Sequence, residues 1–535
     1  MSRLTNVVLG LTTAALTATG GLAATAQGPS APSAVLAPST AQAQGDAELG
    51  AAIDAILADP RFQGSMVSVA VRDAVTGEAL YEHDVDRRLN PASNMKLFSS
   101  AAAMDTLGPD YRFGTDLLAD GAVRGGNLKS DLYLRGGGDP TLLAEDYREL
   151  ARQLKAAGVD RVEGDVVADD SFFDDVPLAT AWSWDDEPFY YSAVTSALTV
   201  APDTDYDSGT VIVRTQPGAA VGAKPAVTLQ PATDAVRVDN RATTSPAGSG
   251  TDLTVERDHA SDRVVVTGSI AADASTNSEW VTVPDPTAYA GDVLARALDA
   301  EGIRLSGRVV QGGTPEGARV LASHESMTVQ ELLTPFMKLS NNMHAEALVK
   351  TMGREATGTG SWSAGLGVVR DYAQRLGVDT STLRISDGSG LSRFDLLSAD
   401  HIADLLTAVQ AEPWFQAWYD ALPIAGNPDR FTGGTLRSRM RDTPAADNLH
   451  GKTGSMTSVT ALSGYVTNAD GRQLVFSMVS NNFLASPRSA EDALGVTLAS
   501  WSEHDGEAPT VSSRSLRRST DYGPADLECS WVKAC

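Results

Sequence analysis

The spacing of hydrophobic residues divides the N-terminal part of the chain into helical and strand-like segments. Apolar residues recur at helical spacing over residues 48–59 and alternate with polar residues over residues 66–72. A turn sequence then leads to a second predicted strand at residues 79–82. Helical spacing returns over residues 97–107, where Gly108 and Pro109 end the run. The pattern therefore predicts a helix, a strand pair and a second helix.

The middle of the chain has a different pattern, with short strand-like segments separated by Gly, Pro, Asp and Ser. Helical spacing resumes near residue 289, and strands return after residue 450. The predicted strands are residues 131–135, 164–168, 209–214, 235–238, 252–255, 263–267, 458–466 and 473–480, with others near 309 and 320. The predicted helices are residues 292–300, 327–338, 345–352, 368–376, 400–409, 412–422 and 491–501.

This order of elements predicts an α/β (α+β) protein. Strands near both ends of the chain would combine in one sheet, and the helices between them would cover it. The β-rich middle would then be an insertion into that domain. Hydrophobic residues make up 42% of the chain, which is enough for a large core.

The charge of the chain excludes some partners. There are 42 Lys and Arg residues against 68 Asp and Glu residues, a formal net charge of −26. Such an acidic chain is a poor partner for nucleic acid or for an anionic membrane surface. The charge does not indicate a type of reaction.

The N-terminus has the pattern of a secretory signal. Arg3 precedes an apolar stretch over residues 7–26, and small-x-small cleavage patterns occur at 24–26 and 41–43. We expect residues 1–43 to be a signal peptide and leader, with a membrane anchor as the alternative. No later run approaches the roughly 20 apolar residues that a membrane span requires, so we expect no stable span and an extracytoplasmic location.

The only two cysteines, Cys529 and Cys535, lie at the end of the chain. They could form a disulfide bond that closes one small loop outside the cell, but such a bond would not stabilise any of the domains. The near-absence of thiols also argues against cysteine catalysis and Cys-ligated zinc. The surrounding polar tail, residues 506–535, is predicted to be disordered or processed.

Ser93 and Lys96 form the first candidate catalytic pair. Asn90 suits the N-cap of the predicted helix and Pro91 its first position, which places Ser93 in the first turn. Lys96 lies three residues on, and hence on the same face. Free N–H groups and the helix dipole favour negative charge there, so Ser93 is a candidate nucleophile. A serine near a helix start is, however, usually only a cap.

Two later motifs strengthen the catalytic interpretation. Ser340 and Asn342 form a Ser-x-Asn motif between two predicted helices, and Lys452, Thr453 and Gly454 form a Lys-Thr-Gly motif that enters a predicted strand. Ser-x-x-Lys, Ser-x-Asn and Lys-Thr-Gly, in this order, are the signature of penicillin-binding proteins and serine β-lactamases. The Gly-Lys-Thr sequence at 451–453 does not fit a phosphate-binding loop, because the required first glycine is absent and a strand follows.

These residue types suit acyl transfer. Ser93 would attack a carbonyl, and Lys96 would accept its proton if burial and nearby Lys452 depress the pKa of Lys96. Ser340 would relay a proton to the leaving amine, and Asn342 would hold the substrate amide and Lys96.

The third motif would bind the substrate. Lys452 and Thr453 would bind its terminal carboxylate, and Gly454 would let the strand pass close to it. The backbone N–H groups of Ser93 and Ser455 would form the oxyanion hole.

With these motifs, the chain from about residue 48 to residue 501 resembles the class C low-molecular-mass penicillin-binding proteins, which are D-alanyl-D-alanine carboxypeptidases/endopeptidases. It is most similar to the secreted DD-peptidases of actinomycetes. The gap of about 250 residues between the first two motifs, seen in the positions of Ser93 and Ser340, is typical of this branch. Further similar segments are residues 132–142, 182–191 and 387–393.

The resemblance implies a penicillin-binding/β-lactamase-like transpeptidase domain with two β-rich domains inserted between the first and second motifs. We expect the transpeptidase domain at residues 44–112 and 305–505. One inserted domain would comprise residues 113–132 and 208–304, and the other residues 133–207.

The resemblance also implies a substrate pocket and a reaction. Trp182, Asp185 and Met456 would line a pocket for the free amino end of the peptidoglycan side chain, with Asp185 pairing with its ammonium group. Ser93 would cleave peptides ending in D-Ala-D-Ala, or D-Ala–diaminopimelate cross-links, and β-lactams would acylate it. No metal or organic cofactor is implied. The alternatives are a serine β-lactamase or esterase and a non-catalytic cell-wall-binding protein.

Overall fold

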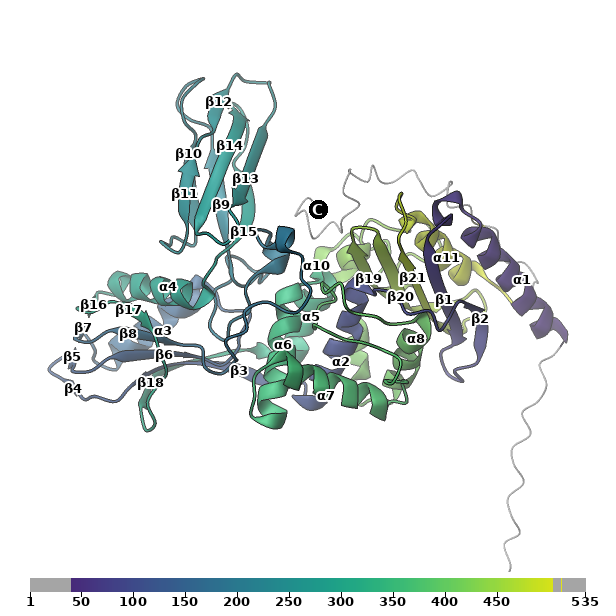
Figure 1. Cartoon of the computed structure of the whole chain (residues 1–535), viewed down its shortest axis with the longest axis horizontal. Helices are drawn as coiled ribbons and strands as arrows, with labels where there is room; N and C mark the ends of the chain where they lie inside the picture. The colour runs from purple at the N-terminus through teal and green to yellow at the C-terminus, as the bar shows by residue number, and fades with distance from the viewer. Residues whose placement is uncertain (1–39, 504–510, 512–535) are drawn as a thin grey trace, which may run out of the picture. The chain divides into compact units, whose positions relative to one another are not determined.

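The computed structural model describes residues 40–503 and residue 511 (Figure 1), with side chains described from residue 45. Almost all of the predicted leader and tail, and both cysteines, lie outside the described residues. Helix α1 (Thr40–Leu57) begins before the predicted start at residue 48 and includes the last residues of the predicted leader. The Ala- and Gln-rich sequence there has high helix propensity. Among the described residues, no helix has both the length and the apolar character of a membrane span.

One antiparallel sheet combines strands from both ends of the chain, as predicted. Its order is β19 (His450–Met456), β20 (Val459–Thr467), β21 (Gln473–Asn481), β1 (Met66–Asp73) and β2 (Ala79–His83). Strand β1 pairs with β21 along its whole length, from Met66 opposite Asn481 to Asp73 opposite Leu474. The edge strand β19 carries the Lys-Thr-Gly motif.

Helices cover both faces of this sheet (Figure 1). Alternate residues of β1 point to opposite faces, so Val67, Val69 and Val71 join a core with α1 and α11 (Arg488–Ser500), whereas Ala70 joins the core on the other side. That second core is formed largely by α2 (Met95–Thr106), α5 (Val329–Leu339), α6 (Asn342–Thr357), α7 (Trp362–Arg375), α8 (Ala399–Ala408) and α9 (Phe415–Asp420). A short helix, α10 (Arg430–Gly433), packs against α5.

Two long antiparallel strands carry the chain out of this domain and back. Strand β3 (Arg112–Ala119) pairs with β18 (Arg319–Thr328), so that Arg112 lies opposite Thr328. They belong to a five-stranded sheet of order β17 (Val309–Gln311), β8 (Val166–Asp169), β6 (Leu132–Gly136), β3 and β18. A smaller sheet has the order β16 (Arg304–Leu305), β7 (Arg161–Val162), β5 (Asn127–Leu128) and β4 (Val123–Arg124). Helices α3 (Ala144–Ala156) and α4 (Pro286–Ala300) pack against each other beside these strands.

The remaining strands form two further sheets. The first has the order β10 (Ala226–Gln230), β9 (Thr210–Gln216) and β15 (Asn277–Thr282). The second has the order β11 (Arg237–Asn240), β14 (Arg263–Ala271) and β12 (Thr243–Ser245), with β13 (Asp252–Arg257) also paired to β14.

Strand pairing groups the insertion differently from the segments predicted from the sequence. The sheet of β3 and β18 also contains β6 and β8, so it draws on all three predicted segments, including residues after 305. This grouping favours one inserted module of residues 113–209 and 283–328 that carries a second module at residues 210–282. Local patterns cannot identify the partners of short strands that are distant in sequence, so the boundaries stay a prediction.

Candidate active site

Ser93 lies in a tight turn at the start of α2. A single 3-10 turn, Ala92–Asn94, leads directly into α2, which begins at Met95. The Oδ1 atom of Asn90 accepts a hydrogen bond from the Ala92 N–H at 2.9 Å. Ser93 therefore precedes the α-helix instead of lying in its first turn as predicted, because the left-handed backbone of Ala92 (φ +45°) cannot continue a regular helix.

Two glycines allow other segments to approach this strained turn. A Cβ atom on Gly390 would lie 1.8 Å from the Ala92 carbonyl oxygen, and one on Gly454 would lie 2.8 Å from the Pro91 carbonyl oxygen. Neither approach is possible with a larger residue in the same position. In the structure the group nearest to Gly454 is the turn before Ser93, and its predicted close approach to the substrate stays a prediction.

Lys96 is fully buried and its Nζ atom faces three oxygen atoms. These are Ser93 Oγ at 2.9 Å, Asn342 Oδ1 at 2.7 Å and the Ser389 carbonyl oxygen at 2.9 Å. The amide and carbonyl oxygens can only accept hydrogen bonds, whereas a hydroxyl can also donate. A neutral Lys96 would thus give one N–H to each of these two acceptors and direct its lone pair at the Ser93 hydroxyl.

The second motif occupies the break between α5 and α6. Ser340 ends α5 in a left-handed conformation (φ +60°), and the Asn341 side chain caps α6 by accepting from the N–H groups of Met343 and His344. Asn342 is then the first residue of α6. Its Oδ1 faces Lys96, and its Nδ2 donates to the Tyr191 carbonyl at 2.8 Å.

The third motif, residues 452–454, contacts each of the first two motifs directly. Lys452 is fully buried on β19, and its Nζ donates to Ser340 Oγ at 2.7 Å. Asn94 Nδ2 donates to the Lys452 carbonyl at 3.1 Å. Together with the Lys96–Asn342 contact, each motif therefore bonds to both of the others. The structure brings Ser93, Lys96, Ser340, Asn342 and Lys452 together, and their catalytic roles stay a prediction.

The other predicted residues of β19 flank this centre. Thr453 Oγ1 donates to Thr435 Oγ1 at 2.8 Å, and Ser455 Oγ accepts from Arg488 Nη2 at 2.9 Å. Both are buried. The predicted oxyanion hole uses the backbone N–H groups of Ser93 and Ser455, and that role stays a prediction.

Two of the predicted pocket residues, Trp182 and Met456, lie beside the turn that carries Ser93. Met456 is buried in a small apolar cluster with Ala92, and Trp182 packs against the same cluster. Asp185 is exposed, three residues after Trp182. A hydrogen bond from the Ser183 side chain, followed by weaker effects that include the positive charge of Arg393, lowers the pKa of Asp185. The carboxylate is therefore available to a cationic group.

Sequence reasoning missed several partners of the predicted residues. The carbonyl groups of Ser389 and Tyr191 hold Lys96 and Asn342, and Thr435 and Arg488 hold β19 side chains. Every residue has a carbonyl group, so no residue type marks such a role. The available signal was the segment 387–393, which carried the family resemblance without an assigned function.

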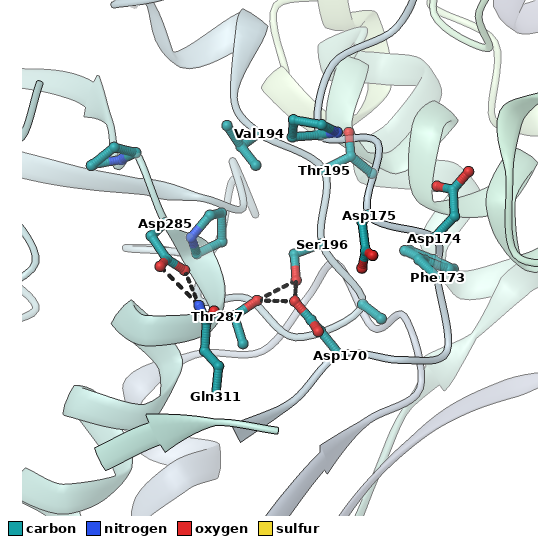
Figure 2. A pocket seen from close by; sticks show the side chains of 14 residues that line it. Asp170, Phe173, Asp174, Asp175, Val194, Thr195, Ser196, Asp285, Thr287 and Gln311 are labelled. Atoms are coloured by element: carbon teal, nitrogen blue, oxygen red, sulfur yellow. Dashed lines mark hydrogen bonds between the residues drawn. The ribbon is translucent and has the colours of Figure 1, made fainter. Parts of the chain in front are cut away.

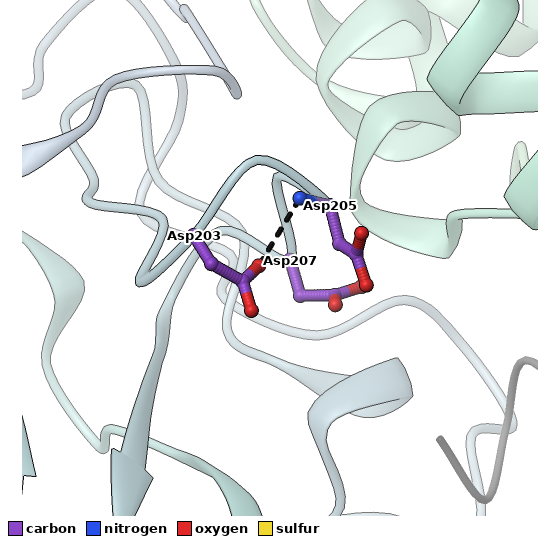
Figure 3. A group of neighbouring side chains, drawn as sticks. All are labelled: Asp203, Asp205 and Asp207. Carbon is purple, nitrogen blue, oxygen red and sulfur yellow. Dashed lines mark hydrogen bonds between the residues drawn. The ribbon is translucent and has the colours of Figure 1, made fainter. Parts of the chain in front are cut away.

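An acidic cluster supports the second motif from the inserted region. Asp203, Asp205 and Asp207 have carboxylate oxygens within 4.8 Å of one another (Figure 3). Asp205 forms an ion pair with Arg430, and Asp207 Oδ1 accepts from Asn341 Nδ2 at 3.1 Å. These oxygens are engaged by protein donors, and we assign no metal to the cluster.

A separate pocket lies where the inserted segments meet (Figure 2). Its acidic residues are Asp170, Asp174, Asp175 and Asp285. Asp170 accepts from Thr287 Oγ1 at 2.5 Å, and both Asp285 oxygens accept from Gln311 Nε2 at 2.8 Å. Its lining contains none of the predicted site residues, so this pocket is distinct from the three-motif centre.

Comparison with known proteins gives one family. The model of the D-Ala-D-Ala carboxypeptidase 3 (S13) family matches residues 49–501. A D-alanyl-D-alanine carboxypeptidase from an Actinomadura species is 45% identical over 492 residues, which cover 91% of this chain and 90% of the relative. D-alanyl-D-alanine carboxypeptidase DacB from Haemophilus influenzae is 26% identical, over 79% of this chain and 86% of the relative.

The fold also matches a solved structure. The crystal structure of penicillin binding protein 4 from Haemophilus influenzae aligns with a TM-score of 0.72 at 24% sequence identity. The alignment covers 82% of this chain and 97% of that structure. The predicted penicillin-binding fold is therefore confirmed.

Proposed function

The chain belongs to the D-Ala-D-Ala carboxypeptidase 3 (S13) family, and on that premise we propose that Ser93 is its catalytic nucleophile. The protein is a serine-type D-Ala-D-Ala carboxypeptidase that acts on peptidoglycan. The single observation that carries the assignment is the convergence of Ser93 Oγ and Asn342 Oδ1 on Lys96 Nζ, at 2.9 and 2.7 Å.

Lys96 is the general base for acylation. Three acceptors around its buried amine are uncharged, and two of them can only accept. As Ser93 Oγ bonds to the carbonyl carbon of the penultimate D-Ala, its proton passes to the neutral Lys96 amine. The peptide C–N bond then breaks, and the proton held by Lys96 passes through Ser340 to the departing amine, which leaves Lys96 neutral again. Water later attacks the acyl-enzyme ester, which regenerates the Ser93 hydroxyl and releases the shortened peptide.

Lys452 and Thr453 bind the terminal carboxylate of the substrate. Lys452 presents a buried positive charge next to Ser340, with Thr453 beside it on the same strand. A charge-assisted hydrogen bond to a carboxylate is roughly twice as strong as a neutral one. The backbone N–H groups of Ser93 and Ser455 bind the oxyanion of the tetrahedral intermediate.

The pocket of Trp182, Asp185 and Met456 selects the side chain of the stem peptide. Trp182 and Met456 pack against a shared apolar cluster, which suits an aliphatic chain, and ionised Asp185 suits a terminal ammonium group. The same site would cleave D-Ala–diaminopimelate cross-links, and β-lactams would acylate Ser93. The N-terminal signal pattern supports secretion to the cell wall.

The test is release of D-alanine from an N-acetylated peptide that ends in Lys-D-Ala-D-Ala, combined with intact-mass analysis after exposure to benzylpenicillin. We expect wild-type protein to release D-alanine and to carry one long-lived penicilloyl adduct. Ser93→Ala should do neither, whereas Ser363→Ala, which changes an exposed serine on α7, should behave as wild type.

Two outcomes would overturn the proposal. Rapid turnover of penicillin without an accumulating adduct would identify a β-lactamase or esterase. Binding to peptidoglycan without release of D-alanine, unchanged by Ser93→Ala, would identify a non-catalytic wall-binding protein.

A further inference from the structure

The loop 386–392 contacts the segment that carries Ser93 and Lys96. Its Ser389 carbonyl accepts a hydrogen bond from Lys96 Nζ at 2.9 Å, and its Gly388 carbonyl accepts one from Ser99 Oγ, one turn further along α2, at 2.8 Å. Gly390 lies against the carbonyl of Ala92, the residue before Ser93. The position of this loop therefore determines where the Lys96 amine points.

Two fully buried carboxylates hold the backbone of this loop. Glu346, on α6, accepts from the Ser389 N–H through Oε1 and from the Gly388 N–H through Oε2, both at 2.9 Å. Its Oε2 also accepts from Trp362 Nε1 at 2.7 Å. Within the loop, Asp387 Oδ1 accepts from the Gly390 N–H at 2.7 Å.

Asp387 also ties the loop to the inserted region. Its Oδ2 accepts from the Ser392 N–H at 2.6 Å and from Trp182 Nε1 at 2.8 Å. The donors to these oxygens of Glu346 and Asp387 are N–H groups, apart from the Ser389 hydroxyl, which donates to Asp387 Oδ2 at a longer 3.4 Å. A carboxylate matches that set of donors, whereas an amide in the same place would turn one N–H group toward another.

A third buried carboxyl, Asp395, differs from the other two. Its Oδ1 accepts from the Ser386 N–H at 2.6 Å, but no donor among the described residues reaches its buried Oδ2. Burial, followed by the neighbouring Asp387, raises the pKa of Asp395 well above its ordinary value. Two neighbouring carboxyl groups can form a hydrogen bond with each other only if one of them is protonated.

We propose that Glu346, Asp387 and Asp395 act together as positioning residues for acylation, with Asp395 in its neutral form donating a hydrogen bond to Asp387. Glu346 and Asp387 fix the loop, and the Ser389 carbonyl of the loop then orients the Lys96 amine toward Ser93. Because Asp387 also holds Trp182, the same loop couples the predicted substrate pocket to the general base. This inference rests on Ser93 being the acylated residue.

Conservative amide substitutions separate the three roles. E346Q and D387N each place an N–H group against a backbone or indole N–H. D395N keeps an oxygen for the Ser386 N–H and supplies an N–H for Asp387, so it imitates the neutral acid. Asp395→Leu removes both functions and leaves Asp387 with a buried, unfilled acceptor.

The experiment measures the acylation rate constant of the full chain with benzylpenicillin, together with the final labelling stoichiometry by intact mass. We expect the acylation rate constants of E346Q and D387N to be lower than wild type by roughly tenfold or more, since each substitution leaves buried N–H groups unpaired. The folded fraction of each variant should still reach one adduct per chain. D395N should stay within about threefold of wild type, and Asp395→Leu should resemble D387N. D371N, which changes an exposed acid on α7, is the matched control.

The rate and the stoichiometry distinguish positioning from folding. A purely structural role would lower the labelled fraction without changing the rate constant of the part that labels, and that result would overturn the proposal. Wild-type rates in E346Q and D387N, or a D395N variant as slow as D387N, would overturn it as well. If E346Q does not accumulate as folded protein, W362F is the substitute, because it removes one hydrogen-bond donor to Glu346. W362F should slow acylation severalfold, and an unchanged acylation rate in W362F would also contradict the proposal. Failure of wild-type protein to acylate would instead refute the role of Ser93.

Discussion

The Nζ atom of Lys452 donates a hydrogen bond to Oγ of Ser340 at 2.7 Å and joins residues that are 112 positions apart in the chain. This contact connects β19, the edge strand of the antiparallel sheet that combines both ends of the chain, to the break between α5 and α6. It places a buried positive charge beside the hydroxyl that is proposed to protonate the leaving group. The arrangement suggests that Lys452 recognises the carboxylate of the leaving D-alanine.

Substitution of Lys452 should remove the preference for a free terminal carboxylate. We expect wild-type protein to cleave a peptide ending in D-Ala-D-Ala much faster than its C-terminal carboxamide. In Lys452→Met that ratio should fall by about tenfold or more, because a charge-assisted hydrogen bond contributes ~1.5–3 kcal/mol. The measurement is kcat/KM for both peptides. A variant that is slower on both by an equal factor would show that Lys452 acts only through Ser340.

Loss of the Lys96 amine should prevent acylation without unfolding the protein. Lys96→Met retains the aliphatic part of the side chain but leaves Ser93 without a base. We expect the acylation rate with benzylpenicillin to fall by about 10²-fold or more, the usual contribution of general base catalysis. Stopped-flow or gel-based labelling gives the rate. Near-normal acylation would mean that another group accepts the proton.

A methyl group at residue 454 should displace the turn that carries Ser93. In Gly454→Ala the new Cβ would lie 2.8 Å from the Pro91 carbonyl oxygen, so the backbone must shift. We expect a loss of roughly 1–3 kcal/mol in stability from overpacking and a larger proportional loss in acylation, measured by thermal unfolding and labelling rate.

Gly367→Ala is the control for this variant. Gly367 is exposed on α7 with no atom within 4 Å of the added Cβ, so alanine should leave activity unchanged and raise helix stability slightly. Equal behaviour of the two variants would show that the close approach at Gly454 is unimportant.

The pocket of Trp182, Asp185 and Met456 should matter for substrates with a free amino group. We expect Asp185→Asn to reduce kcat/KM for a stem peptide with a free side-chain ammonium by at most about fivefold, because an exposed ion pair is weak. The N-acetylated form of the same peptide should be affected little. An equal loss on both peptides would place Asp185 outside the substrate pocket.

The buried His344 should make the protein less stable in acid. Burial is the main cause that lowers the pKa of His344 from 6.5 to about 3. Below pH 6.5 the unfolded chain therefore takes up a proton that the folded chain does not. The free energy of unfolding should fall by about 1.4 kcal/mol per pH unit from this residue alone.

The difference between wild type and His344→Gln isolates this effect. Other buried groups titrate in both proteins, so their contributions cancel when the two curves are compared. Thermal midpoints measured from pH 7 to pH 5 should therefore fall more steeply for wild type than for His344→Gln. Parallel curves would contradict a neutral buried His344.

Several elements of the domain built from both ends of the chain could be predicted because they depend on local patterns. The helix predicted at residues 327–338 corresponds to α5, where Thr328 and Glu331 form a capping box, and the strand predicted at residues 66–72 corresponds to β1. The segment at Ser93 could not be predicted in detail, because its left-handed backbone at Ala92 is imposed by packing against Gly390 and Gly454. Local propensity alone would have continued the helix.

The sequence by itself determined which side chains are proposed to carry the chemistry: three short motifs in a fixed order contain Ser93, Lys96, Ser340, Asn342 and Lys452. Tertiary structure decided which atoms hold them, such as the Ser389 carbonyl at Lys96 and the Tyr191 carbonyl at Asn342. It also decided the sheet partners of the inserted strands. The physical reason is that backbone groups are the same in every residue, so their roles arise only when distant segments of the chain pack together.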